Sequence, residues 1–162
     1  MATSVREFSV FLENKPGRMA QVCTAISREK INIAALAVAE RKERSVLRLV
    51  TEDPTQTRQV LKQLNLPFDE HDVLLVEMRN QPGAVAQVCE TLAQEHINIE
   101  YAYCSAGVKN GKAIGIFRVS NLPKALKALA DNAARLKRKA HGARGWVNSP
   151  RRGPAAPAPM AD

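Results

Sequence analysis

The feature that most constrains the fold is a long internal repeat. The stretch ENKPGRMAQVCTAISREKINI, which begins at Glu13, returns as RNQPGAVAQVCETLAQEHINI from Arg79. With a shift of 66 residues, 11 of the 20 positions from Asn14 to Ile33 are identical. Self-similarity of this length indicates two structural copies of one unit, and two copies are too few for a solenoid. The interpretation that remains is a pair of small domains packed together.

Each copy contains the same order of predicted elements. Alternating apolar residues at 5–12 and 72–78 predict a half-buried strand, and a helix with one apolar face follows in both copies. Two β-prone runs then predict a hairpin, which is three or four residues longer in the second copy. The next helix begins at Asp53, where Asp-Pro-Thr-Gln is typical of an N-cap followed by a first-turn proline, and at Asn121 in the second copy.

This order predicts an α+β fold of two ferredoxin-like βαββαβ repeats with antiparallel sheets and helices on one face. We expect the repeats at residues 1–70 and 71–134, followed at 135–162 by a flexible tail that is first basic and then Pro/Ala-rich. In the second copy the last helix runs on, and only RGWV, ending at Val147, remains as a candidate fourth strand. A copy of about 65 residues buries little core alone, so the two copies are expected to share a sheet or to pack their helices together.

Charge and composition limit the classes of function. Of the 24 basic residues, seven lie within 132–162, where there is one acidic residue, so the net charge of +8 belongs mainly to this end. A basic tail can bind nucleic acid or another acidic partner, although a solvated end has the same composition. No apolar run reaches the about 20 residues of a membrane span, and no secretion signal is recognisable, so a cytoplasmic protein is expected.

The sequence predicts neither an enzyme nor a metalloprotein. Three cysteines without CxxC spacing and three scattered histidines indicate no metal centre. There is no serine or cysteine with a plausible histidine partner, no GxGxxG or P-loop, and no acidic metal cluster. We therefore expect a non-catalytic protein without a cofactor.

The repeated loop has the chemistry of an anion site. Proline follows Lys15 and Gln81, which makes these residues the predicted N-caps, and neither side chain is a good cap. The next backbone N–H groups then lack a side-chain acceptor at the positive end of a helix dipole, where a carboxylate would fit. The alternative is that Asn14 and Asn80 satisfy these donors themselves and that proline and glycine only shape a turn.

The stretches that begin at Glu13 and Arg79 resemble the loop, helix and strand entry of the ACT-domain family, over about residues 5–130. A tandem ACT-domain protein implies a regulatory, allosteric module that forms a homodimer with a continuous sheet and acts on a protein partner. The family resemblance also implies that an amino acid or similar zwitterion binds at the repeat or subunit interface, between the Pro-Gly loop and the start of the second strand. These positions are Asn14, Gly17, Arg18, Met19, Asn32, Ile33, Asn80, Gly83, Ala84, Val85, Asn98 and Ile99.

Differences between the copies leave several questions open. Glu13 and Arg18 of the first loop are replaced by Arg79 and Ala84 in the second, so the two pockets are expected to differ, with the Arg18 pocket favoured. Tyr101 and Tyr103 share a strand face and belong either to the core or to a pocket wall. Two other functions stay open: binding of nucleic acid or an acidic partner through the basic tail, and a purely structural dimerisation module whose loops bind nothing.

Overall fold

The predicted fold class is confirmed by the architecture of the chain. The computed structural model describes residues 1–41, 44–106 and 111–144. Its six strands form one antiparallel sheet in the order β2-β3-β1-β4-β6-β5. Along the chain the elements are β1 (Ala2–Glu13), α1 (Arg18–Arg28), β2 (Ile33–Arg41), β3 (Arg44–Thr51), α2 (Pro54–Gln63), β4 (Phe68–Arg79), α3 (Ala84–Gln94), β5 (Ile99–Ala106), β6 (Lys112–Val119) and α4 (Leu122–Arg144).

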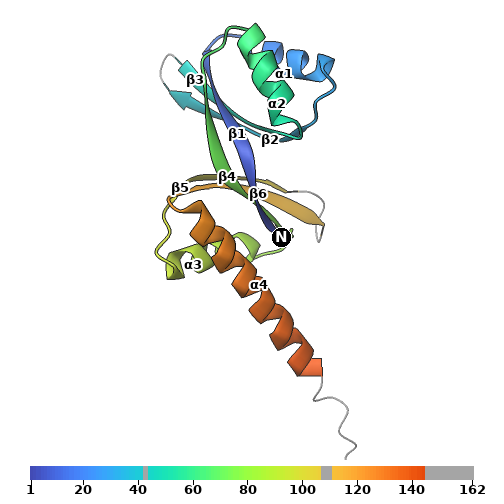
Figure 1. Cartoon of the computed structure of the whole chain (residues 1–162), viewed down its shortest axis with the longest axis vertical. Coiled ribbons are helices and arrows are strands. Elements are labelled where there is room, and N and C mark those ends of the chain that lie inside the picture. The colour runs from blue at the N-terminus through green and yellow to red at the C-terminus, as the bar shows by residue number, and fades with distance from the viewer. Residues whose placement is uncertain (42–43, 107–110, 145–162) are drawn as a thin grey trace, which may run out of the picture.

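The strands β1 and β4 are shared by both repeats and run from one half of the molecule to the other (Figure 1). They pair antiparallel from Ala2 opposite Val76 to Val10 opposite Phe68. The C-terminal half of β1 also pairs with β3, and the C-terminal half of β4 with β6. Each long strand is therefore the first strand of its own repeat and the fourth strand of the other.

The fourth strand of repeat two thus comes from the beginning of the chain, which the sequence did not reveal. Instead of a strand after the last helix, α4 continues to Arg144, ten residues beyond the predicted boundary of repeat two at residue 134. The candidate strand RGWV falls at residues 144–147, and all but its first residue lie outside the described part. The hairpin of repeat two is also only two residues longer than that of repeat one, since Ile99 pairs with Val119 and Ile33 with Thr51.

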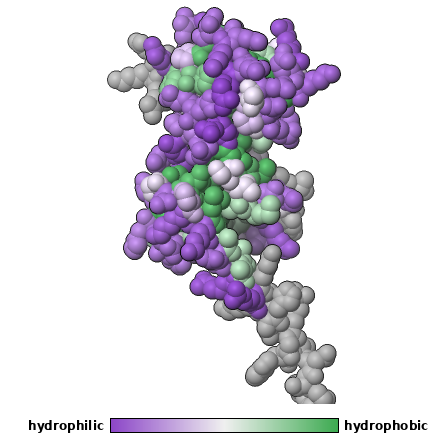
Figure 2. Space-filling model, viewed as in Figure 1, coloured by the Kyte–Doolittle hydropathy of each residue, from purple (hydrophilic) through white to green (hydrophobic). Residues whose placement is uncertain are grey.

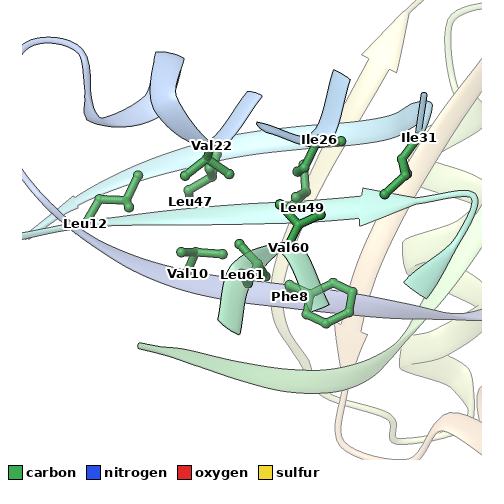
Figure 3. Close-up of a cluster of buried hydrophobic side chains, with 10 residues drawn as sticks. All are labelled: Phe8, Val10, Leu12, Val22, Ile26, Ile31, Leu47, Leu49, Val60 and Leu61. Atoms are coloured by element: carbon green, nitrogen blue, oxygen red, sulfur yellow. The ribbon is translucent and has the colours of Figure 1, made fainter. Parts of the chain in front are cut away.

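Each repeat has a core between its two helices and the sheet. In repeat one, alternate β1 residues meet apolar residues of α1 and α2, among them Val22, Ile26 and Leu61, all buried (Figure 3). In repeat two, the equivalent core includes Leu74, Val88, Leu92 and Phe117. The strand and helix periodicities of the sequence predict these faces correctly.

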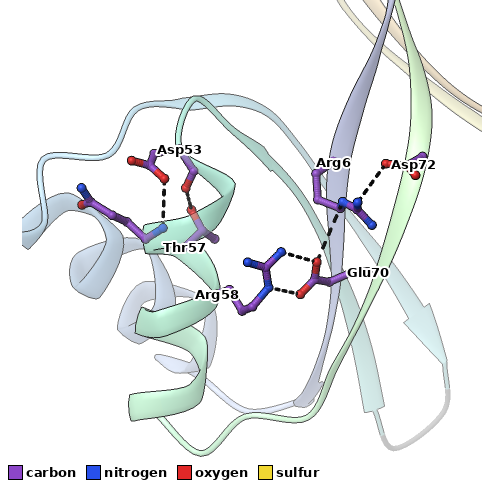
Figure 4. A network of polar contacts seen from close by, with 7 residues as sticks. Arg6, Asp53, Thr57, Arg58, Glu70 and Asp72 are labelled. Carbon is purple, nitrogen blue, oxygen red and sulfur yellow. Dashed lines mark hydrogen bonds and ion pairs between the residues drawn. The ribbon is translucent and has the colours of Figure 1, made fainter.

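In repeat one the fourth strand, β4, follows α2 directly in the chain, so the repeat is closed by its own chain. Polar contacts fix α2 to the sheet (Figure 4). The predicted cap is confirmed, because Asp53 accepts a hydrogen bond of 2.9 Å from the N–H of Gln56. The guanidinium of Arg58 donates two hydrogen bonds, of 2.5 and 2.7 Å, to the carboxylate of Glu70 on β4. A paired guanidinium and carboxylate of this geometry orients α2 on the first half of β4.

The sheet face away from the helices joins the two repeats. Glu7 is fully buried there and accepts hydrogen bonds from the hydroxyls of Tyr101 (2.5 Å) and Tyr103 (2.7 Å). Arg48 of β3 stacks on the ring of Tyr101 at 3.4 Å. Two strands separate β1 from β5 in the sheet order, so the sheet must curl for Tyr101 to reach Glu7. Both tyrosines are therefore part of the contact between the repeats.

Candidate functional site

The two repeated loops have the same backbone, and glycine is its defining residue. Gly17 and Gly83 are the N-cap residues of α1 and α3, and both have φ of 86°, in the left-handed region. A Cβ at either position would meet no atom within 4 Å, so glycine is needed for its conformation rather than for a close approach. The prediction that Lys15 and Gln81 are the N-caps is wrong, because each helix starts two residues later.

Some backbone donors of each loop are paired within the loop. The N–H of Arg18 donates to the carbonyl of Lys15 at 3.4 Å, and that of Ala84 to the carbonyl of Gln81 at 3.2 Å. No N-cap side chain accepts a hydrogen bond from either helix, because the N-cap residue is glycine and has no side chain. Asn14 and Asn80 both take part in interactions of their own, so neither is a free binding group. The loops therefore present an uncapped helix start, with the asparagines already engaged.

Charges distinguish the two loops. In loop one, Arg18 donates a hydrogen bond of 2.7 Å to Glu13, and Lys15 lies 3.2 Å from the same carboxylate oxygen. The hydrogen bond from Arg18, followed by that from Lys15, lowers the pKa of the Glu13 carboxyl. In loop two, Arg79 stands at the position of Glu13 and makes no ion pair with any described residue. Loop one thus holds an internal carboxylate on Arg18, whereas loop two offers a cation.

The start of the second strand does not lie beside the loop of the same repeat. The helix α1 separates the two, and its 11 residues span about 16 Å. Asn32 donates a hydrogen bond of 2.9 Å to Glu52, and the N–H of Asn98 donates one of 3.1 Å to the hydroxyl of Ser120. Ile33 and Ile99 open the edge strands β2 and β5. The predicted set therefore forms four places in the chain: two loops and two strand starts.

The two loops are themselves far apart. Because β1 and β4 are antiparallel, with Ala2 opposite Val76, their C-terminal ends point to opposite ends of the sheet. At about 3.3 Å per residue, Glu13 and Arg79 are separated by roughly 45 Å along the strands. A small molecule cannot contact both loops of one chain.

Apolar side chains are exposed close to these places. Met19 and Val85, which occupy equivalent positions in the first turns of α1 and α3, are 42% and 43% exposed. Leu36 and Val38 of the edge strand β2 are 36% and 51% exposed. Large apolar side chains grouped at a loop and at a sheet edge are typical of an interaction surface.

A cavity of about 510 Å³ adjoins loop two and was not predicted. It is bounded by α3, α4 and the neighbouring ends of β1 and β4, and its lining includes Ala84 of the predicted set. Other lining residues come from the start of the chain, such as Ala2, and from its last described part, such as Asn132. No local pattern in the sequence brings these residues together.

Comparison with known proteins identifies the family. The family model for an ACT domain pair matches residues 3–138. The chain belongs to the ACT domain pair family. Among curated proteins, this ACT domain pair is 32% identical over 115 residues to the acetolactate synthase small subunit of Mycobacterium bovis, covering 61% of this chain and 68% of the relative. The corresponding subunit of Mycobacterium avium is 28% identical over 108 residues, covering 57% and 65%.

Solved structures share the fold of this chain. The ACT domain pair is 34% identical to protein BT0572 from Bacteroides thetaiotaomicron, with a TM-score of 0.75 over 82% of this chain and 90% of that one. The regulatory subunit of aspartate kinase from Thermus thermophilus shares the fold, with 15% identity and a TM-score of 0.59 over 81% and 94% of the two chains.

Within residues 1–41, 44–106 and 111–144, none of the helices combines the length and the apolar character that a membrane crossing requires. In the same part of the chain, no three His, Cys, Asp or Glu side chains are grouped as a metal site.

Proposed function

We propose that this ACT domain pair is a non-catalytic regulatory subunit that binds an amino acid or similar zwitterion and thereby controls an enzyme partner. The observation that carries the proposal is the pair of identical loops, in which a left-handed glycine leaves the start of α1 and of α3 without a side-chain cap. Helix starts of this kind attract carboxylates, because their N–H groups and the helix dipole both favour negative charge. The relationship to acetolactate synthase small subunits supports a role beside a catalytic chain.

The geometry favours a ligand at a subunit interface rather than between the repeats. Roughly 45 Å of strand separates the two loops of one chain. Within one repeat, α1 or α3 separates the loop from the strand start. A second copy that covers an edge strand and its exposed apolar residues would bring its own strand start to the loop. Met19 and Leu36, both exposed, are on the surface that such a dimer buries.

Loop one has a built-in competitor for the ligand. The carboxylate of Glu13 occupies Arg18, at 2.7 Å, in the way that a ligand carboxylate would. Binding at this loop requires that Glu13 be displaced, and removal of the Glu13 charge should therefore strengthen binding. The Glu13→Gln and Arg18→Ala variants give opposite expected results, which makes the assignment testable.

The test is a thermal-shift and calorimetric screen of the twenty amino acids, with the molar mass measured by light scattering with and without the ligand. A ligand at a hundredfold excess over its Kd should stabilise the folded chain by about 2.7 kcal/mol. We expect Glu13→Gln to bind more tightly, Arg18→Ala more weakly, and the control Glu29→Gln, at the far end of α1, to bind unchanged.

Two results would count against the proposal. If no amino acid stabilises the wild-type chain or the Glu13→Gln variant, the loops have only a structural role. In that case a dimer whose mass is independent of any amino acid would indicate a dimerisation module. If a ligand binds equally well to all four proteins, it binds elsewhere.

A further inference from the structure

The two repeats differ where the second helix of each meets the end of the sheet. In repeat one the chain turns after α2 and returns Leu64, Leu66 and Phe68 onto the core. In repeat two α4 continues to Arg144, so no described residue after this helix returns to the core. Repeat one therefore shows what fills this place when the repeat is closed by its own chain.

Equivalent positions can be assigned from hydrogen bonds. Val10 pairs with Phe68 in repeat one, and Val76 pairs with Ala2 in repeat two, so Ala2 takes the position of Phe68. The caps Asp53 and Asn121 both accept from the N–H three residues later, which aligns α2 with α4.

By this alignment Asn132 stands at the position of Leu64. Met1 stands at the position of Pro67, because the N–H of Glu77 donates to the carbonyl of Met1 just as the N–H of Phe11 donates to the carbonyl of Pro67. Repeat two thus has Ala2 for phenylalanine and Asn132 for leucine.

The space left by these smaller residues is the cavity of about 510 Å³. Small-molecule binding sites commonly have volumes of roughly 300 to 1,000 Å³. The floor is formed by Val76 and Met78 of β4, and the walls by α3 and α4, with Val88 and Leu129 facing the space. In Figure 2, hydrophobic surface gathers at the middle of the molecule and over the adjoining part of repeat two. The body of a bound molecule would therefore lie against aliphatic side chains.

Polar groups inside the cavity are already paired. The amide of Asn132 donates to the hydroxyl of Thr91 at 2.8 Å, and this hydroxyl donates to the carbonyl of Gln87 at 2.7 Å. This chain of hydrogen bonds ties α4 to α3 across one wall, so the cavity walls are held in place without a ligand.

The opening of the cavity toward β4 is positively charged. A second hollow of about 350 Å³ adjoins it and shares Met1, Glu77 and Arg79 with it, and Lys112 lines the second hollow. Lys112 lies 3.7 Å from Glu77, whereas Arg79 is in no ion pair with a described residue. Two cationic side chains thus lie beside one carboxylate here, a balance that favours an anion.

We propose that the cleft between α3 and α4 of repeat two, which we call the α3–α4 cleft, binds a small monocarboxylate with an aliphatic body. The aliphatic part occupies the place that repeat one fills with Leu64, Leu66 and Phe68. The carboxylate lies at Arg79. This site is formed within one chain and in one repeat only. It adjoins loop two through Arg79, Gln81 and Ala84, but unlike the proposed interface sites it needs no second subunit.

The probes are hexanoate, hexylamine and 1-hexanol, which share one alkyl chain and differ in charge. Backbone amide spectra of the full chain are recorded during titration with each. We expect hexanoate to shift signals of α3, α4 and the end of β4, and to bind at least about tenfold more tightly than hexylamine. Equal affinity for all three probes, shifts confined to other surfaces, or no binding by hexanoate would overturn the proposal.

Two sets of variants test the cleft and its charge separately. Ala2→Phe combined with Asn132→Leu copies the filling of repeat one and should weaken hexanoate binding at least about tenfold, while Ala93→Leu, on α3 outside the cleft, should not. Arg79→Glu should reverse the preference from hexanoate to hexylamine. This exposed substitution keeps the test valid if the double variant does not fold. Unchanged binding by a folded double variant, or unchanged preference in Arg79→Glu, would overturn the proposal.

Discussion

Repeat one completes its fold with residues that follow its own second helix, whereas repeat two takes its fourth strand from the start of the chain. The two long strands β1 and β4 are each part of both repeats, but only β4 follows the second helix of the repeat that it closes. Identical loops and similar helices therefore do not make the repeats interchangeable. Neither repeat has four complete strands without the other, so we infer that they unfold together.

The face between the repeats shows the same asymmetry in its chemistry. On one side of the contact lie Glu7, Arg48 and the two tyrosines. The equivalent residues on the other side are Val73, Ile116, Ala35 and Ala37, three of which belong to a buried apolar cluster. One half of the contact is thus specified by hydrogen bonds and the other by apolar packing. Such a polar half fixes one arrangement of the repeats, because a shifted arrangement would leave a buried carboxylate without its donors.

The largest loss of stability should come from removal of residues 1–5. This deletion takes away the fourth strand of repeat two and uncovers Leu74 and Val76. We expect a loss of about 4 kcal/mol or more in the free energy of unfolding, from ladder hydrogen bonds and apolar burial together. Urea unfolding and amide exchange of α3 and α4 would measure it. Equal losses of protection in repeat one and repeat two would show that the two repeats unfold together. No loss of protection in either repeat would refute the role of β1 in repeat two.

The substitution Glu7→Val should have the next largest effect, although it copies the residue at the equivalent position, Val73. It leaves the two tyrosine hydroxyls without their acceptor and Arg48 with Ser9 but no carboxylate, and breaking a buried charged network in this way costs about 3 kcal/mol or more. Adding Arg48→Ile, Tyr101→Phe and Tyr103→Phe should recover much of that loss, since an apolar contact then replaces the polar one. Urea titration of both variants is the measurement. A quadruple variant less stable than Glu7→Val alone would show that the polar groups stabilise the contact separately.

A smaller effect is expected from Phe68→Ala, which gives repeat one the residue that Ala2 supplies to repeat two. The Phe68 ring packs edge-on against Phe8, with ring centroids 5.8 Å apart, but is only partly buried. We expect a loss of about 2 kcal/mol, below the usual value for a fully buried phenylalanine. Calorimetric unfolding of this variant beside Ala2→Phe, which should not destabilise the protein, compares the two closures directly. Similar losses in both would mean that the α3–α4 cleft is not a true gap.

The smallest effect is a pH dependence of the contact between the repeats. Burial, followed by the hydrogen bond to Glu7, raises the pKa of Tyr101 to about 12. Burial and then the charge of Glu7 also raise the pKa of Tyr103. The neutral phenol is favoured in the fold, so this stabilisation is complete below the ordinary pKa of 10.0 and is lost as the pH rises from there toward 12.

The chain has only these two tyrosines, so the absorbance of tyrosinate reports on them alone. We expect their ionisation to coincide with alkaline unfolding in the wild type and to begin at lower pH in Glu7→Gln, which lacks the charge. Ordinary titration of both tyrosines in the folded wild-type protein would contradict the buried network.

The sequence predicted which segments form the two loops, and the errors about their details have physical reasons. The repeated Pro-Gly segments lead into α1 and α3, as expected. The N-caps were misplaced onto Lys15 and Gln81, because the rule for residues before proline does not foresee that the following glycine adopts a left-handed conformation. The cleft could not be predicted, since its walls come from Ala2, Thr91 and Asn132, which no short pattern relates.

The sequence by itself determined the duplicated order of elements, the buried faces, the caps at Asp53 and Asn121, and the family. These features depend on neighbours within a few residues, whose spacing is visible in one dimension. Only the tertiary structure decided that the first strand completes repeat two, that Glu7 joins both tyrosines, and that the loops lie at opposite ends. Such contacts link residues more than seventy positions apart, and they are selected by which surfaces remain to be buried once the local elements exist.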